Sequence, residues 1–148
     1  MYRVVIILMV LFCAGCGVLS NAAVRLHPAL ASEDADFRTW VDEQLHRTRV
    51  LLGPERVGVR LWEVPPMVAP EAIDAWAGVG FYADGAFASV YVFGHQRDHE
   101  AAFEKLRDVT PDGVIVWHTS NGAKLFYGYT TDHEDLLITM VSAFAGDE

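Results

Sequence analysis

The chain is poor in cysteine, and both of its cysteines, Cys13 and Cys16, lie in an apolar N-terminal segment. The remainder of the chain therefore has no disulfide framework and no thiol nucleophile. A Cys-x-x-Cys pair can bind zinc or carry redox chemistry, but no second pair accompanies this one. The small number of cysteines excludes disulfide scaffolds and thiol enzymes.

Basic residues are also scarce, with 11 Lys and Arg against 20 Asp and Glu and a formal net charge of −9. An acidic surface repels nucleic-acid phosphates, and no stripe of basic residues is present, so the sequence predicts no nucleic-acid partner. The same charge argues against a domain that lies flat on anionic lipid. Any membrane attachment must therefore come from another part of the chain.

The common catalytic motifs are missing as well. The sequence has no nucleophile elbow, no phosphate-binding loop and no dinucleotide-binding fingerprint. His99-Glu100 and His133-Glu134 each lack the second histidine, one helical turn later, that a zinc-protease helix requires. The sequence therefore favours a binding protein over an enzyme.

One long hydrophobic run is present, and it lies at the N-terminus. Arg3 is followed by an unbroken stretch of 16 apolar or small residues, from Val4 to Leu19. A transmembrane helix needs about 20 such residues, so this run is short for one. A positive start, an apolar stretch and small residues at its end are typical of a secretory signal. We therefore expect the folded part to lie outside the cytoplasm.

The end of this segment, Ala14-Gly15-Cys16, resembles the lipobox of bacterial lipoproteins, although Cys13 stands where that family has an aliphatic residue. The resemblance implies that residues 1–16 are a lipoprotein-type signal peptide and that Cys16 is acylated. It also implies that the protein is anchored to a membrane of the cell envelope. Two alternatives stay open: cleavage after Ala22 would release a soluble secreted or periplasmic domain, and a retained segment would be an uncleaved anchor.

After the signal, the composition predicts a tether and one domain. Residues 17–32 contain Pro28 and several alanines without hydrophobic periodicity, which indicates a tether. Residues 33–148 have the length of a single domain. That domain begins with a helix, because apolar residues recur every three or four positions from Phe37 to Leu52.

A unit of two strands and a helix is predicted twice, in residues 79–107 and in residues 114–145. Asp84-Gly85 and Asn121-Gly122 are hairpin turn signals between alternating apolar runs. The two ββα units are consistent with an internal duplication. They predict an α+β fold, with a predominantly antiparallel sheet of about five strands and helices packed on it.

One group of histidines and carboxylates suggests a metal site. His95 ends a predicted strand and His99 begins the next helix, with Asp98 beside it. If duplication places the equivalent corners at one edge, His133 approaches them, and imidazole and carboxylate ligands suit zinc or another divalent metal. The alternative function is therefore a metal-binding protein or hydrolase that uses His95, Asp98, His99 and His133. Acidic residues also stabilise helix starts without any metal, so the main prediction contains no cofactor.

Aromatic residues on the predicted strands form the candidate binding surface. They are Tyr82, Tyr91, Trp117, Tyr127 and Tyr129. Several must fall outside the core, and tyrosine or tryptophan on an uncovered sheet face suits contact with a protein or a glycan. The alternative is that the N-terminal helix covers this face. The sequence thus predicts a lipid-anchored binding or interaction module of a bacterial envelope, with an envelope protein or a glycan as its partner.

Overall fold

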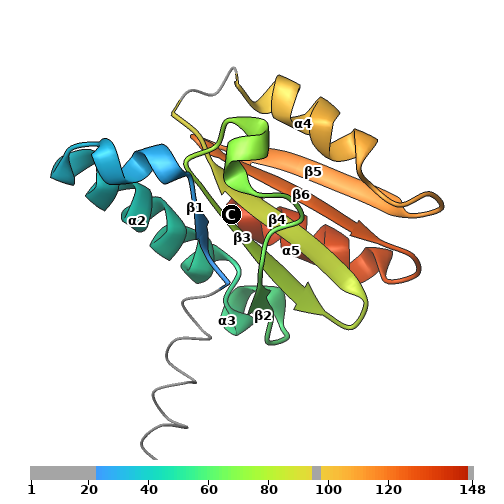
Figure 1. The fold of residues 1–148 in the computed structure, drawn as a ribbon. Coiled ribbons are helices and arrows are strands. Elements are labelled where there is room, and N and C mark those ends of the chain that lie inside the picture. Colours follow the sequence, from blue (N-terminus) through green and yellow to red (C-terminus); the bar gives the residue numbers. More distant parts are fainter. Residues whose placement is uncertain (1–22, 95–97, 147–148) are drawn as a thin grey trace, which may run out of the picture.

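The computed structural model describes residues 23–94 and 98–146, and it contains one six-stranded sheet with helices on both faces (Figure 1). All strand pairs are antiparallel, in the order β1-β3-β4-β6-β5, and β2 pairs with β3 as well. The strands are β1 (Arg25–Leu26), β2 (Trp62–Val64), β3 (Ala77–Ala83), β4 (Ala86–Val92), β5 (Ile115–Asn121) and β6 (Lys124–Thr130). The predicted α+β fold is confirmed.

Four α-helices and two short 3-10 helices accompany the sheet in the described part of the chain. The α-helices are α2 (Ala35–Leu51), α3 (Pro54–Val57), α4 (Asp98–Asp108) and α5 (Glu134–Ala145). The 3-10 helices are η1 (Pro28–Ser32) and η2 (Pro70–Ile73). Across residues 23–94 and 98–146, no helix combines the length and the apolar content needed to cross a membrane.

The folded part starts earlier than the sequence predicts. Residues 25–32 were expected to belong to a tether, but they form β1 and η1, and Leu30 is buried in the core. Leu26 of β1 pairs with Ala77 of β3. The prediction was wrong here because a strand of two residues is stabilised by its partner strand and has no periodicity of its own.

Both predicted hairpins are present, and each closes over two residues. Asp84 and Gly85 have φ values of 47° and 81°, the pattern of a type I′ turn. The second turn consists of Gly122 and Ala123, one residue later than predicted, and Gly122 has a φ of 59°. A glycine at the first turn position with positive φ is typical of a type II′ turn. Such two-residue turns fix the register of both hairpins.

The sheet separates two hydrophobic cores. Side chains on one face, including Val79, Val90 and Phe126, pack against α2 and α5. Side chains on the other face, including Tyr91 and Leu125, pack against α4 and against the segment of residues 67–75. In Figure 1, α5 lies behind the sheet, whereas η2 and the chain before it cross in front. A two-fold rotation about an axis perpendicular to the sheet would place α4 and α5 on the same face. Because they lie on opposite faces, no such rotation relates the two ββα units.

The second face is covered only in part. Residues from Pro65 onward cross it closely, so that a Cβ atom at Gly80 would lie 2.6 Å from the Pro65 carbonyl oxygen. At Gly78 a Cβ atom would lie 2.8 Å from the ring of Tyr91. The two glycines thus provide the space for this crossing. Within residues 23–94 and 98–146, the part of the face nearer to the Asp84-Gly85 turn is more open, because Tyr82 is exposed there.

Candidate binding surface

A row of large side chains crosses the uncovered part of the second face. The strand register places the five residues opposite one another on successive strands, and they are Trp62, Tyr82, Phe87, Tyr129 and Val116. Cross-strand partners project from the same face and touch their neighbours. We call these five residues the aromatic row. Its four aromatic members span three steps between strands, about 14 Å at the usual strand spacing.

The two members at the β2 end of the row are the most exposed. Trp62 is 57% exposed and Tyr82 is 43% exposed, whereas Phe87, Tyr129 and Val116 are half-buried. Neighbouring groups hold the rings in place. The Arg60 guanidinium carbon lies 4.5 Å from the ring centre of Trp62, and the ring centres of Phe87 and Tyr129 are 5.4 Å apart. The row therefore presents supported ring surfaces to the solvent.

The next row toward the middle of the sheet is covered, which sets the boundary of the surface. The Met67 backbone N–H donates to the Ser89 hydroxyl at 2.8 Å. Phe103 of α4 packs on His118 and Tyr127, with ring centres 4.1 Å and 5.8 Å away. The segment after Pro65 and helix α4 thus reach the row that contains Ser89, Tyr127 and His118. They leave the aromatic row exposed to the solvent.

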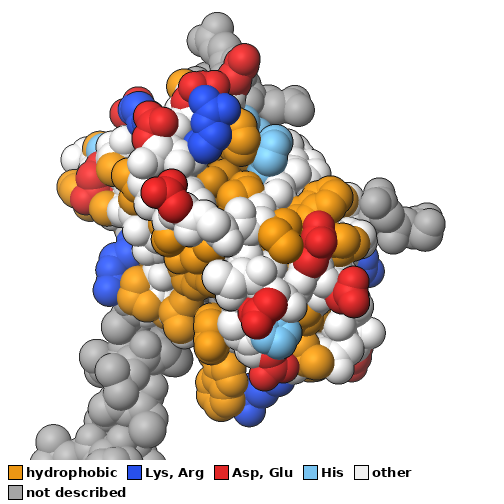
Figure 2. Space-filling view, turned by 90° about the vertical axis from the view of Figure 1, so that its right-hand side faces the viewer, with side chains coloured by type: hydrophobic (Ala, Val, Ile, Leu, Met, Phe, Trp, Pro, Cys, Tyr) orange, Lys and Arg blue, Asp and Glu red, His pale blue; other side chains and the backbone are white. Residues whose placement is uncertain are grey.

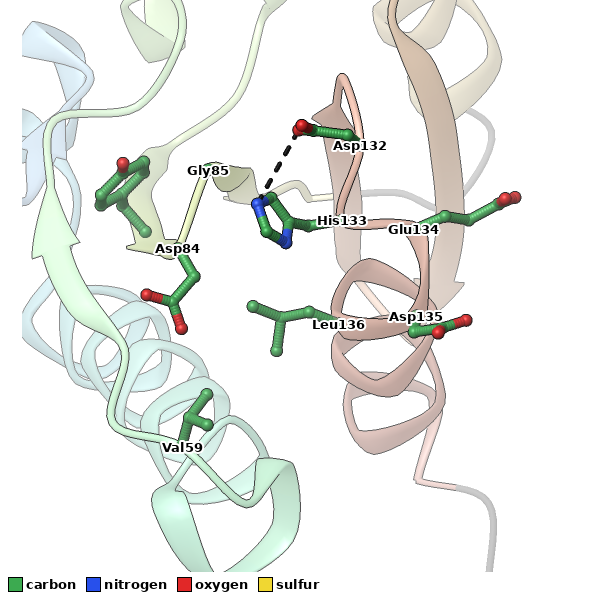
Figure 3. A pocket seen from close by; sticks show the side chains of 9 residues that line it. Val59, Asp84, Gly85, Asp132, His133, Glu134, Asp135 and Leu136 are labelled. Atoms are coloured by element: carbon green, nitrogen blue, oxygen red, sulfur yellow. Dashed lines mark ion pairs between the residues drawn. The ribbon is translucent and has the colours of Figure 1, made fainter.

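A shallow cavity of about 690 Å³ lies beside Tyr82, the second member of the row (Figure 3). The Asp84-Gly85 turn and the first turn of α5 form its walls. Figure 3 shows that Asp84, His133 and Leu136 point toward the space, whereas Glu134 and Asp135 point away from it. The cavity therefore offers the carboxylates of Asp84 and Asp132 and the imidazole of His133, which lies 3.8 Å from the Asp132 carboxylate, next to the ring of Tyr82.

Two of the predicted binding tyrosines are not accessible. Tyr91 and Tyr127 are fully buried, so the prediction that they lie on an open face was wrong. The Tyr91 hydroxyl donates to the Val68 carbonyl at 2.9 Å and accepts from the Val68 N–H at 3.0 Å. Burial raises the pKa of Tyr91 above its usual value. The Tyr127 hydroxyl lies 2.6 Å from the hydroxyl of Thr110. Both tyrosines are therefore core residues whose hydroxyls are satisfied.

The other predicted aromatics divide between the two faces. Tyr82 and Tyr129 belong to the aromatic row. Trp117 is 39% exposed on the opposite face, where its indole N–H donates to the Glu134 carboxylate at 3.1 Å. Two of the predicted aromatics therefore share the second face with Trp62 and Phe87. The sequence signal for Trp62 was its strand composition, which does not specify its partner strand.

The predicted metal ligands do not meet in one place. His99 is buried at the start of α4, with its Nδ1 atom 2.9 Å from the Ser120 hydroxyl. His133 follows the far end of β6, about 20 Å away along a strand of this length. The prediction of convergence was wrong because β4 and β6 are antiparallel, so the helices after them start at opposite ends of the sheet.

Other parts of the predicted site lie beyond the structure. His95 and the predicted lipidation residue Cys16 fall outside the described residues, and only the backbone of Asp98 is described. Within residues 23–94 and 98–146, no three His, Cys, Asp or Glu side chains are grouped to hold a metal ion.

The chain was compared with models of protein families, with characterised proteins and with solved structures. No family model, characterised protein or solved structure matches it.

Proposed function

We propose that this protein is a non-catalytic binding module of a bacterial cell envelope, held at the membrane by a lipid on Cys16. The aromatic row is its contact surface. The observation that carries the proposal is the position of Trp62 and Tyr82, which are exposed side by side on a sheet face that is covered elsewhere. The apolar leader and the lipobox resemblance support the membrane attachment.

The chemistry of the row suits binding. Tryptophan and tyrosine are enriched at contact sites because they offer a large apolar area together with a polar group at low entropic cost. Their rings are already supported by Arg60 and by the neighbouring strands, so little order has to be gained on binding. Such preorganised aromatic side chains are typical hot spots.

The alternative function, a metal-binding protein or hydrolase, has less support. It required His99 and His133 in one site, and these two residues lie at opposite ends of β6. The acidic cavity beside Tyr82 contributes polar contacts to the binding surface in this proposal, without a catalytic step.

The proposal is tested by retention on the immobilised full-length chain in detergent. The probes are detergent-solubilised envelope proteins and, separately, sheared cell-wall glycan. Replacing both Trp62 and Tyr82 by Ala should weaken retention of the partner at least tenfold, because truncating a hot-spot residue costs about 2 kcal/mol or more. Thermal stability should change little, since both side chains are exposed.

The matched control replaces two exposed apolar residues elsewhere, Val50 and Val109, which are 58% and 55% exposed. This control variant should retain the partner as well as the wild type does. Equal retention by the wild type and the Trp62/Tyr82 variant would show that the row is not the contact surface.

A further inference from the structure

The two edges of the sheet are protected very differently. At one edge, β3 is covered by the short strands β1 and β2, and Pro65-Pro66 follows β2. At the other edge lies β5, which pairs with β6 along its whole length without a bulge. Its sequence, Ile-Val-Trp-His-Thr-Ser-Asn, contains no proline and no lysine. Proteins use such residues, together with short strands and bulges, to block pairing at an exposed edge.

The hairpin geometry identifies which backbone groups of β5 face outward. A two-residue turn is flanked by a hydrogen-bonded pair, here Asn121 and Lys124, and the bonds to β6 then alternate along the strand. The N–H and C=O groups of Val116, His118 and Ser120 therefore point away from β6. In the described part of the chain, β5 has no backbone hydrogen bonds to any segment other than β6.

The outer edge of β5 is continuous with the aromatic row. Val116 is the last member of the row, directly opposite Tyr129, and it is half-buried. A strand added beside β5 would place its own side chain next to Val116 on the same face. On the other face, the added strand would approach Trp117, which is 39% exposed.

We propose that β5 accepts an extended, positively charged segment of a partner protein as an additional strand of the sheet. The inference rests on the proposed function and defines the partner as a polypeptide that continues the aromatic row. A polypeptide in extended conformation is the ligand that satisfies alternating outward N–H and C=O groups. Contacts between the side chains of the segment and the aromatic row then determine which segments bind.

The charge around β5 selects a basic segment. The Glu134 carboxylate accepts from Trp117 at 3.1 Å, and Asp135 lies beside it in the first turn of α5. On the other face, the Glu104 carboxylate is already paired with Arg107 at 3.0 Å. The whole chain carries a formal net charge of −9, and acidic side chains are spread over the side of the molecule drawn in Figure 2. Lysine or arginine in the segment therefore complements this edge.

A second copy of the chain fits the edge less well. Antiparallel pairing of two β5 strands would bring the two α5 helices side by side in opposite directions. The acidic first turn of each helix, with Glu134 and Asp135, would then lie beside the C-terminus of the other. The last turn of α5 has no basic residue, so this contact joins like charges.

The test uses the isotope-labelled full-length chain in detergent and a synthetic nine-residue peptide of alternating lysine and valine with blocked ends. Binding of the peptide should slow hydrogen exchange at the amides of Val116, His118 and Ser120. Two matched peptides are the controls. One is methylated on every backbone nitrogen, so that neither of its edges can donate hydrogen bonds, and it should bind at least tenfold more weakly. The other carries glutamate in place of lysine and should also bind more weakly.

A protein variant gives an independent arm. His118→Pro removes an outward N–H, a position at which an edge strand tolerates proline. It should weaken peptide binding about tenfold, whereas His118→Ala removes the same imidazole, keeps the N–H and should bind within about twofold of the wild type. If the proline variant fails to fold, the methylated peptide still tests the same hydrogen bonds.

The outcomes separate this inference from the proposed function. If the peptide is bound without protection of the three amides and the Trp62/Tyr82 variant loses it, strand addition is wrong and the aromatic row remains the binding surface. If the row retains cell-wall glycan and the peptide does not slow exchange at these amides, strand addition is likewise wrong and the row remains the binding surface. A concentration-dependent dimer that protects these amides without peptide overturns the choice of partner. If peptide, glycan and envelope proteins are all unbound, both proposals fail.

Discussion

Replacing Tyr91 by Phe should reduce stability, whereas the same change at an exposed tyrosine of the binding surface should not. The change removes a hydroxyl that makes two hydrogen bonds to the backbone of Val68, at 2.9 Å and 3.0 Å. A buried polar group left without a partner costs about 1–3 kcal/mol. Because Val68 is half-buried, water can replace part of the loss, and we take the lower end for each group. The expected destabilisation is therefore about 2 kcal/mol.

Denaturant unfolding measures this loss directly, and thermal unfolding should show a decrease of roughly 6–10 °C for a domain of this size. Tyr82→Phe is the matched control, because Tyr82 is 43% exposed and no hydrogen bond of its hydroxyl is found within the described residues. Its stability should stay within about 0.5 kcal/mol of the wild type. If Tyr91→Phe is as stable as Tyr82→Phe, the two bonds to Val68 do not stabilise the fold and the argument is refuted.

The raised pKa of Tyr91 adds a pH signature. Burial keeps the phenol protonated in the folded state, whereas in the unfolded chain it ionises near its usual value of 10.0. The folded state then binds the proton more tightly, so this contribution is fully present below pH 10.0 and is lost as the pH rises toward the folded pKa. The phenylalanine variant should lack this part of the alkaline loss.

Two further predictions concern Lys124 and Cys16. Lys124 is only 4% exposed, and burial, with a smaller effect from the charge of Arg47, lowers its pKa below 10.5. Lys124→Met should therefore raise the free energy of unfolding at pH 7 by about 1–3 kcal/mol. The wild type should become more stable as the pH rises through the folded pKa of Lys124 toward 10.5, and the variant should lack this increase. Denaturant unfolding measures both effects. Cys16→Ala should release the protein from membranes or leave an uncleaved precursor in cell fractionation. A wild-type chain whose mature N-terminus is an unmodified Ala23, as read by mass spectrometry, would contradict the lipid anchor.

The elements that the sequence predicted correctly have strong local signals. Asp84-Gly85 and Gly122 require positive φ, and alternating apolar residues flank both turns, so the two hairpins follow from short-range chemistry. The helix α5 has a buried stripe of Leu137, Met140 and Phe144 at helical spacing. Such features need no information from distant parts of the chain.

The binding surface could be predicted only in part, because burial on one sheet face depends on distant segments. Tyr91 and Tyr129 are the same residue type on the same face, yet Tyr91 lies under the segment of residues 67–75 and Tyr129 lies in the open row. Nothing in the alternation of the strands distinguishes them. The position of Trp62 likewise depends on the register of β2 against β3, which no turn connects.

His99 and His133 lie far apart for a topological reason. The similarity between the segments after His99 and His133 suggested equivalent positions, but strand order decides where each helix starts. Because β6 runs antiparallel to β4 at the centre of the sheet, similar sequences were placed at opposite ends.

The central position of β6 also determines the order in which the chain can fold. Each hairpin closes over a two-residue turn, and such hairpins form within about 1–10 μs. The two hairpins join only where β4 pairs with β6, between residues far apart in the chain. During synthesis, the edge of β4 therefore stays unpaired, and the apolar surface that α5 covers stays open, until residues 124–145 have been made. The N-terminal half of this protein therefore completes its fold only when the C-terminal half does.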